Sequence, residues 1–188
     1  YVFDYLDLLS QIRLLATCWT FRNELDITDM YNIDCKYKNR LTQTIINKYI
    51  NLKSLNASFN SEITTVNHLI KLEILDASYS CGINDAGIVN CINLKSLNAS
   101  DNKKITTVNH LIKLEILDAK DCCGINDAGI VNCVNLKSLN AFNNRKITTV
   151  KHLIKLEILD AAYYCGINDD GIVNCINLKS LNASDNKK

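Results

Sequence analysis

The sequence repeats itself with a period of 42 residues, and this self-similarity constrains the fold more than any other feature. Three full copies and the start of a fourth run from Asn51 to Ile92, Asn93 to Val134, Asn135 to Ile176 and Asn177 to Lys188. Each copy divides into a 20-residue and a 22-residue unit, and both units open with Leu-x-x-Leu-x-Ala. Units of this length indicate a stack of similar coils, in which each coil buries apolar side chains against its neighbours.

The first unit of each copy predicts a short strand, a turn and a return segment. Leu55 and Ala57 alternate as in a strand with one buried face, and Asn60 follows them. A buried Asn at such a turn can satisfy backbone groups of neighbouring coils. We therefore predict that Asn60 and its copies Asn102, Asn144 and Asn186 are structural. The steps of three residues from Ile63 onward predict a helical or 3₁₀ return on the convex side.

The second unit carries a more specific pattern. Asn84 and Asp85 precede a short apolar run, as helix N-caps do. The unit resembles the cysteine-containing class of leucine-rich repeats, through Ile83, Asp85, Gly87, Ile88 and Cys91. The resemblance implies an α/β solenoid that is right-handed, with a parallel concave sheet and short convex helices or 3₁₀ turns. Cys81 lies one residue later than the turn cysteine of that class, which leaves Ser80, Cys122 and Tyr164 in the usual slot.

Charges alternate between successive units. The position after the first Leu of each unit is occupied in turn by Lys53, Glu73, Lys95, Glu115, Lys137, Glu157 and Lys179. Because stacked strands lie about 4.8 Å apart, like charges in every coil would repel, and the alternation places opposite charges side by side. Exposed pairs contribute less than about 1 kcal/mol each. We interpret this pattern as a means of setting solubility and register, not as a binding code.

The nine cysteines form neither a Cys-x-x-Cys motif nor a zinc-ribbon pattern. Six of them occur at fixed positions of the repeat: Cys81, Cys91, Cys123, Cys133, Cys165 and Cys175. We therefore predict buried, reduced thiols, which implies a reducing compartment and a cytoplasmic location.

Positions that differ between the nearly identical copies cluster just after each predicted strand. We expect their side chains to point outward along one edge of the concave sheet and to specify something other than folding. Exposed aromatic residues among them are typical anchors of protein interfaces, and neutral drift at unconstrained surface sites is the alternative. The predicted partner-binding residues are Phe59, Tyr79, Asp101, Lys103, Lys120, Asp121, Phe142, Asn143, Arg145, Tyr163 and Tyr164.

Composition and spacing narrow the classes of function. A net charge of +1 gives no field that favours nucleic acid or an anionic membrane, and no apolar run reaches the roughly 18 to 20 residues of a membrane span. His68, His110 and His152 recur two coils apart, roughly 10 Å, which is too far for ligands of one zinc ion. No residue shows a nucleophile-and-base pattern. We expect a non-enzymatic chain without metal or cofactor, whose partner is a protein.

Residues 1–38 do not repeat, and we predict that they form a helical N-terminal cap on the solenoid. The stretches 2–6 and 11–22 resemble the second half of an F-box, whose opening Leu-Pro would lie before Tyr1. The resemblance implies docking on the Skp-type adaptor of a cullin ubiquitin ligase. It assigns the adaptor contact to Phe3, Leu6, Ile12, Leu14, Leu15 and Cys18.

These patterns favour an F-box-like segment at 1–38 followed by leucine-rich repeats at 39–188, together forming the substrate receptor of a ubiquitin ligase. Two alternatives stay open. One is a free-standing binding solenoid without a ubiquitin link, and the other is a surface adhesion protein with a secretion signal and paired cysteines. The richness in Asn, Ile and Lys without Pro resembles repeat proteins of giant viruses, which implies the host cytoplasm. We also expect a fragment of a longer protein, since the chain lacks an initiating Met and ends inside a repeat.

Overall fold

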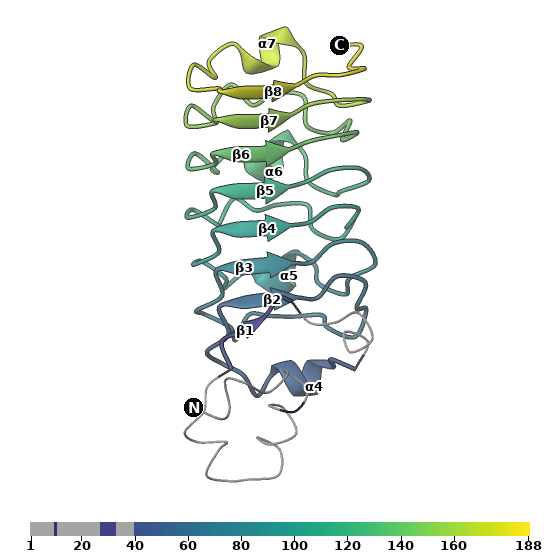
Figure 1. Cartoon of the computed structure of the whole chain (residues 1–188), viewed down its shortest axis with the longest axis vertical. Helices are drawn as coiled ribbons and strands as arrows, with labels where there is room; N and C mark the ends of the chain where they lie inside the picture. Colours follow the sequence, from purple (N-terminus) through teal and green to yellow (C-terminus); the bar gives the residue numbers. More distant parts are fainter. Residues whose placement is uncertain (1–9, 11–26, 33–39) are drawn as a thin grey trace.

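The computed structural model describes residue 10, residues 27–32 and residues 40–188 of the chain. In these residues, eight short strands form one parallel sheet whose strands follow each other in chain order (Figure 1). The strands are β1 (Asp29–Met30), β2 (Ser54–Asn56), β3 (Ile74–Asp76), β4 (Ser96–Asn98), β5 (Ile116–Asp118), β6 (Ser138–Asn140), β7 (Ile158–Asp160) and β8 (Ser180–Asn182). The predicted parallel sheet is confirmed.

The register of the sheet places equivalent residues of successive units side by side. Leu55 pairs with Leu75, and Leu75 pairs with Leu97. These leucines and the alanines two residues later are buried, because alternate residues of a strand point to the same face. The strand with one buried face that Leu55 and Ala57 predict is therefore confirmed, and the core is a continuous column of such side chains from coil to coil.

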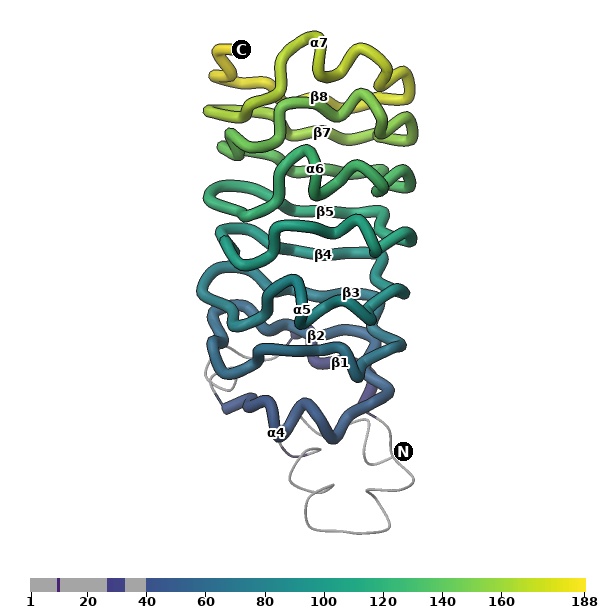
Figure 2. The backbone as a smooth tube through the Cα atoms, turned by 180° about the vertical axis from the view of Figure 1, so that it is seen from behind, coloured from purple at the N-terminus to yellow at the C-terminus, as the bar shows by residue number. Residues whose placement is uncertain are grey.

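In the part of the chain that the structure describes, four one-turn helices lie on the side of the coils opposite the sheet (Figure 2). They are α4 (Gln43–Ile46), α5 (Asp85–Ile88), α6 (Asp127–Ile130) and α7 (Asp169–Ile172). Asn84 caps α5 as predicted, since its side-chain oxygen accepts a hydrogen bond from the Gly87 N–H at 3.0 Å. The copies Asn126 and Asn168 cap α6 and α7 in the same way.

The return segments of the first units were predicted as helical or 3₁₀, and only the 3₁₀ alternative fits, as single turns: the Leu69 N–H donates to the Val66 carbonyl and the Leu72 N–H to the Leu69 carbonyl, both at 2.9 Å. The segment after Ile63 consists of extended residues and turns, without a helix. The Val66 N–H donates to the Gly87 carbonyl of the next coil at 2.8 Å, so it is not available to a carbonyl within its own segment. Within the repeats, the 20-residue unit thus returns as an extended segment bonded to the following coil, and the helices α5, α6 and α7 lie in the 22-residue units.

The sheet begins within the segment predicted as the N-terminal cap. β1 pairs with β2, and the buried side chains of Ile27 and Met30 join the core with Leu41 and Ile46. The first coil therefore has its own strand and reaches across the predicted boundary at residue 38. Residues 1–9, 11–26 and 33–39 lie outside the described residues, and the predicted helical cap falls mostly on them.

Gly129 tests how closely the coils are stacked. A Cβ added to this residue would overlap the Thr106 carbonyl oxygen of the preceding coil, which is backbone and has little freedom to move. We expect Gly129→Ala to lower the free energy of unfolding by about 2 to 3 kcal/mol, as measured by chemical denaturation. Ala128→Ser, at an exposed position of the same helix, is the control and should change it by about 0.5 kcal/mol or less. Equal effects of both substitutions would contradict this packing.

Candidate functional site

The turns that follow the strands bury different residues in the two kinds of unit. In the first unit Asn102 is buried and the next residue, Lys103, is exposed. In the second unit Cys122 is exposed and the next residue, Cys123, is buried. The inversion explains why the turn cysteine falls one residue later than in the class that the sequence resembles. It also leaves the variable residues Ser80, Cys122 and Tyr164 at the surface.

The turns that follow β2 to β8 contain the described non-glycine residues with positive φ. They are Phe59, Tyr79, Asp101, Asp121, Asn143, Tyr163 and Asp185, with φ between 53° and 64°. Asn and Asp tolerate this left-handed conformation better than other non-glycine residues, whereas bulky side chains in it are strained by about 1 to 2 kcal/mol. All seven belong to the positions that vary between copies. We call the surface formed by these turns, residues 58–62 and 78–80 and their copies, the variable edge.

The aromatic residues of the variable edge contact one another across coils. The rings of Phe59 and Tyr79 stack with centroids 4.2 Å apart and planes inclined by 11°. At the other end of the edge, Tyr163 lies nearly parallel to Phe142 and meets Tyr164 edge-on, with centroid distances of 5.7 and 4.3 Å. These rings remain accessible, with Phe59 63% and Tyr163 43% exposed. Stacked rings that keep half their surface in water form ready contact areas for another protein.

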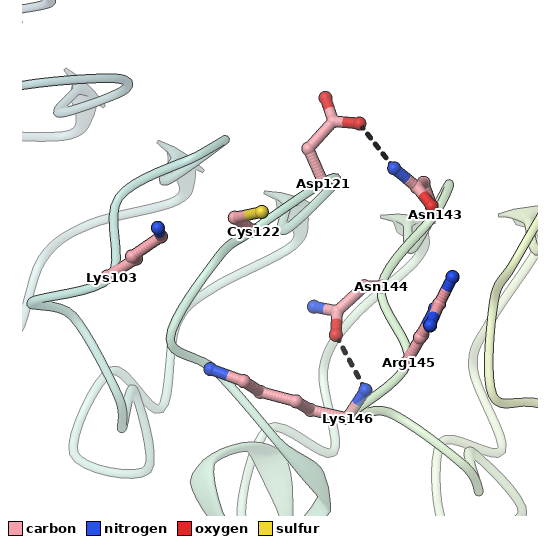
Figure 3. A pocket seen from close by; sticks show the side chains of 7 residues that line it. All are labelled: Lys103, Asp121, Cys122, Asn143, Asn144, Arg145 and Lys146. Atoms are coloured by element: carbon pink, nitrogen blue, oxygen red, sulfur yellow. Dashed lines mark hydrogen bonds between the residues drawn. The ribbon is translucent and has the colours of Figure 1, made fainter.

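Charged and polar residues lie between the two aromatic groups. The Asn143 amide donates to the Asp121 carboxylate at 3.2 Å, and the Arg145 guanidinium lies 4.7 Å from the centroid of the Tyr164 ring. An open pocket of about 450 Å³ is lined by Lys103, Asp121, Cys122, Asn143, Asn144, Arg145 and Lys146 (Figure 3).

The residues predicted to bind a partner therefore lie at or beside one row of turns. The structure brings together Phe59 with Tyr79, Asp121 with Asn143, and the group of Phe142, Arg145, Tyr163 and Tyr164. Lys103 joins the pocket. Asp101 and Lys120 are linked through the backbone only, since the Asp101 N–H donates to the Lys120 carbonyl at 3.2 Å. The binding role of all these residues remains a proposal.

Sequence reasoning missed the exposed aliphatic residues. Ile74, Ile116 and Ile158 lie on the outer face of the sheet, in register with serines of the first units. A second row occupies the turn before each strand and is formed by Ile50, Ile70, Ile92, Ile112, Val134, Ile154 and Ile176, each about half exposed or more. In the sequence these residues look like further core positions, because they are apolar and recur from copy to copy. Only their exposure in the structure distinguishes them from the core.

The alternating charges form the expected ion pairs. Lys95, Lys137 and Lys179 each contact the Glu of the preceding coil at 2.7 to 2.9 Å. The hydrogen bond from Lys95 lowers the pKa of Glu73, and the same bond raises the pKa of Lys95. All these groups are exposed to solvent, so the pairs set register and contribute little to stability.

The six repeat cysteines are free and buried, as predicted. Burial raises the pKa of Cys81 and Cys123 to about 11 and that of Cys91 to about 12. The Cys91 thiol also donates to the Val66 carbonyl, with an S···O distance of 3.5 Å. Such thiols stay protonated and inert near neutral pH. Cys122 differs from them, because it is exposed in the pocket of the variable edge.

The three histidines serve the stacking of the coils. The Nε2 atoms of His68, His110 and His152 lie 3.0 to 3.3 Å from backbone carbonyl oxygens of the preceding coil. Among the described residues, no group of three or more His, Cys, Asp or Glu could hold a metal ion, and no helix is long and apolar enough to cross a membrane.

The predicted adaptor-binding residues lie outside the described residues. They are Phe3, Leu6, Ile12, Leu14, Leu15 and Cys18.

Neither a protein-family model nor a curated protein sequence matches the chain. The fold of the chain is, however, similar to that of several solved structures. An internalin (inlF) from Listeria monocytogenes has a TM-score of 0.58 and 20% identity over 84% of this chain and 45% of its own. The functional domain of InlJ from the same organism, described as including a cysteine ladder, has a TM-score of 0.56 and 22% identity over 73% of this chain and 31% of its own. The chain thus spans less than half the length of either structure.

These similarities, together with the single open parallel sheet and its short helices, define the fold as a leucine-rich-repeat solenoid. The predicted fold class is confirmed. At this level of identity the similarity concerns the fold.

Thiol labelling tests the two environments of cysteine. In the folded chain, iodoacetamide at pH 8 should alkylate Cys122 rapidly and spare the six repeat cysteines. The raised pKa values of the repeat cysteines keep their thiols protonated, and burial keeps the reagent away from them. Peptide mapping by mass spectrometry measures the sites, and the denatured chain, in which all should react, is the control. Labelling of Cys81 or Cys91 at the rate of Cys122 would contradict the described packing.

The left-handed turns predict an unusual response to substitution. Phe59→Asn and Tyr163→Asn should relieve backbone strain while losing a ring contact, so we expect the free energy of unfolding to stay within about 1 kcal/mol of the original. Chemical denaturation measures it. A loss of more than about 2 kcal/mol for either variant would show that these rings are needed for folding.

Proposed function

We propose that the chain is a protein-binding scaffold that captures its partner at the variable edge. The repeats supply a rigid frame in which each turn is held by its neighbours, and the variable side chains stand along that frame at intervals of about 4.8 Å. Such an arrangement presents many side chains to one extended partner surface and needs no catalytic group.

One observation carries this proposal. Phe59, Tyr79 and Tyr163 occupy left-handed positions that folding alone would give to Gly, Asn or Asp, and Asn or Asp does occupy the other four positions. Their rings are partly exposed, so burial in the chain does not compensate for the strain. Neutral drift would disfavour aromatic residues at such positions. A binding requirement accounts for them, because exposed Tyr and Phe are frequent anchors of interfaces.

A finer proposal concerns the ubiquitin system. The F-box-like pattern in residues 1–38 supports a substrate receptor whose N-terminal segment binds a Skp-type adaptor in the cytoplasm, while the repeats at 39–188 capture the substrate. The alternative is a free-standing binding module without a ubiquitin link. The two differ only in the role of the N-terminal segment, and the variable edge has the same task in both.

A comparison of two multiple variants tests the binding edge. The edge variant replaces Phe59, Tyr79 and Tyr163 by Asn, and the control variant replaces the exposed Val89, Val131 and Val173 by Asn. We expect proteins that cross-link to the original chain in cell extract to be retained by the control and reduced at least about tenfold by the edge variant, since interface anchors contribute about 2 kcal/mol or more. Quantitative mass spectrometry measures the recovery. Equal recovery by both variants would refute the proposed edge.

An adaptor-binding assay tests the finer proposal separately. The chain should bind a purified Skp-type adaptor, and Leu14→Asp with Leu15→Asp should abolish this binding because a charge is placed in an apolar contact. Arg40→Gln, outside the F-box-like stretch, is the control. Absence of binding by a chain extended upstream of Tyr1 would leave the free-standing module.

A further inference from the structure

We infer that the pocket of the variable edge binds an oxyanion, a phosphoryl or carboxylate group carried by a side chain of the captured protein. This inference rests on the proposed function, because the captured protein supplies the anion. It adds the chemistry that the partner must carry at one defined place.

The pocket concentrates positive charge. Three of its lining side chains are cationic, namely Lys103, Arg145 and Lys146, and one is anionic, Asp121, which leaves a net charge of +2. The chain as a whole carries only +1. All three cations are specific to the later copies, since the first copy has Ser61 and Glu62 where the second has Lys103 and Lys104 and the third has Arg145 and Lys146.

The two lysines of the pocket lack the counter-group that two repeating rows of lysines on the solenoid have. Lys95, Lys137 and Lys179 are paired with Glu, and Lys71, Lys113 and Lys155 donate to Asn side chains. Within the described part of the chain, the ammonium groups of Lys103 and Lys146 form no hydrogen bond or ion pair. Neighbouring cations without a counter-ion repel each other, and an anion between them would remove that repulsion.

The geometry favours a group that enters from outside. Figure 3 shows the side chains of Lys103 and Lys146 on the side of the pocket where the Cys122 thiol lies, while Asp121 points toward Asn143. The Asn143 amide thus binds the carboxylate of Asp121, the one acidic side chain that lines the pocket. Arg145 is oriented by the Tyr164 ring at 4.7 Å, which leaves the N–H groups of its guanidinium for bidentate contact with an oxyanion. A volume of about 450 Å³ admits a whole side chain with its anionic head.

The exposed Cys122 thiol makes the charge of the pocket measurable. Iodoacetate is an anion and iodoacetamide is neutral, and both alkylate the same thiolate. The ratio of their rates at Cys122 therefore reports the local potential, independently of the thiol pKa. We expect this ratio to fall about threefold in the double variant Lys103→Gln, Lys146→Gln. The control Lys113→Gln, Lys155→Gln removes the same charge at the other side of the strands and should leave the ratio unchanged.

Inorganic phosphate then serves as the first probe. We expect it to slow iodoacetate labelling of Cys122 more than sodium chloride of equal ionic strength does, and this protection should disappear in Lys103→Gln, Lys146→Gln. Short peptides that differ only in phosphoserine, glutamate or serine identify the source. Stronger protection by the phosphoserine peptide indicates a phosphoryl ligand, and equal protection by the phosphoserine and glutamate peptides indicates a general carboxylate site.

Protection by phosphate no greater than that by chloride would overturn the inference. The outcome is distinguishable from failure of the proposed function. In one outcome, the aromatic edge variant loses its partner while the original chain shows no phosphate effect and Lys103→Gln, Lys146→Gln keeps the partner. This result would support the binding role of the variable edge and refute the anion site. If phosphate protects Cys122 from iodoacetate but no partner depends on Phe59, Tyr79 and Tyr163, the anion site is supported and the proposed binding edge is refuted.

Discussion

The hydrogen bonds of the buried Asn residues at the turns are the interaction on which the rest of the structure depends. The Asn102 amide donates to the carbonyls of Ala77 and Ile83 at 2.7 and 3.2 Å, at the two ends of the preceding turn, and its oxygen accepts the N–H of Lys104 at 2.9 Å. Asn144 repeats this pattern one copy later. Each turn is thus tied to the one before it, and the chain must leave the strand through a left-handed residue.

This constraint separates the residues that fold the chain from those available for recognition. Buried Asn, Leu and Cys side chains are almost identical from copy to copy, while the residues beside them point outward at a fixed spacing and vary. The exposed side chains of the variable edge can change without disturbing the core, because they contact each other and solvent.

Much of the fold could be predicted from the sequence, because Leu55 and Ala57 alternate, Asn60 recurs and the copies align without gaps. The helical return of the first unit could not, since the steps from Ile63 to Leu69 fit a helix equally well, and the bond from Val66 to Gly87 of the next coil decides the outcome. The variable residues were located from their differences alone. Their left-handed backbone and the pocket at Lys103 depend on contacts between coils that no single repeat contains.

The most direct test of this account compares two asparagines that each donate to a carbonyl of a preceding coil. Asn102 does so in the interior, and Asn93 does so at the surface, where its amide donates to the Ile70 carbonyl at 2.7 Å. Asn102→Asp should lower the free energy of unfolding by about 3 kcal/mol or more, because a buried carboxylate cannot donate these bonds. Asn93→Asp should change it by less than about 1 kcal/mol. Similar values for both, measured by urea denaturation, would contradict the central role of the buried ladder.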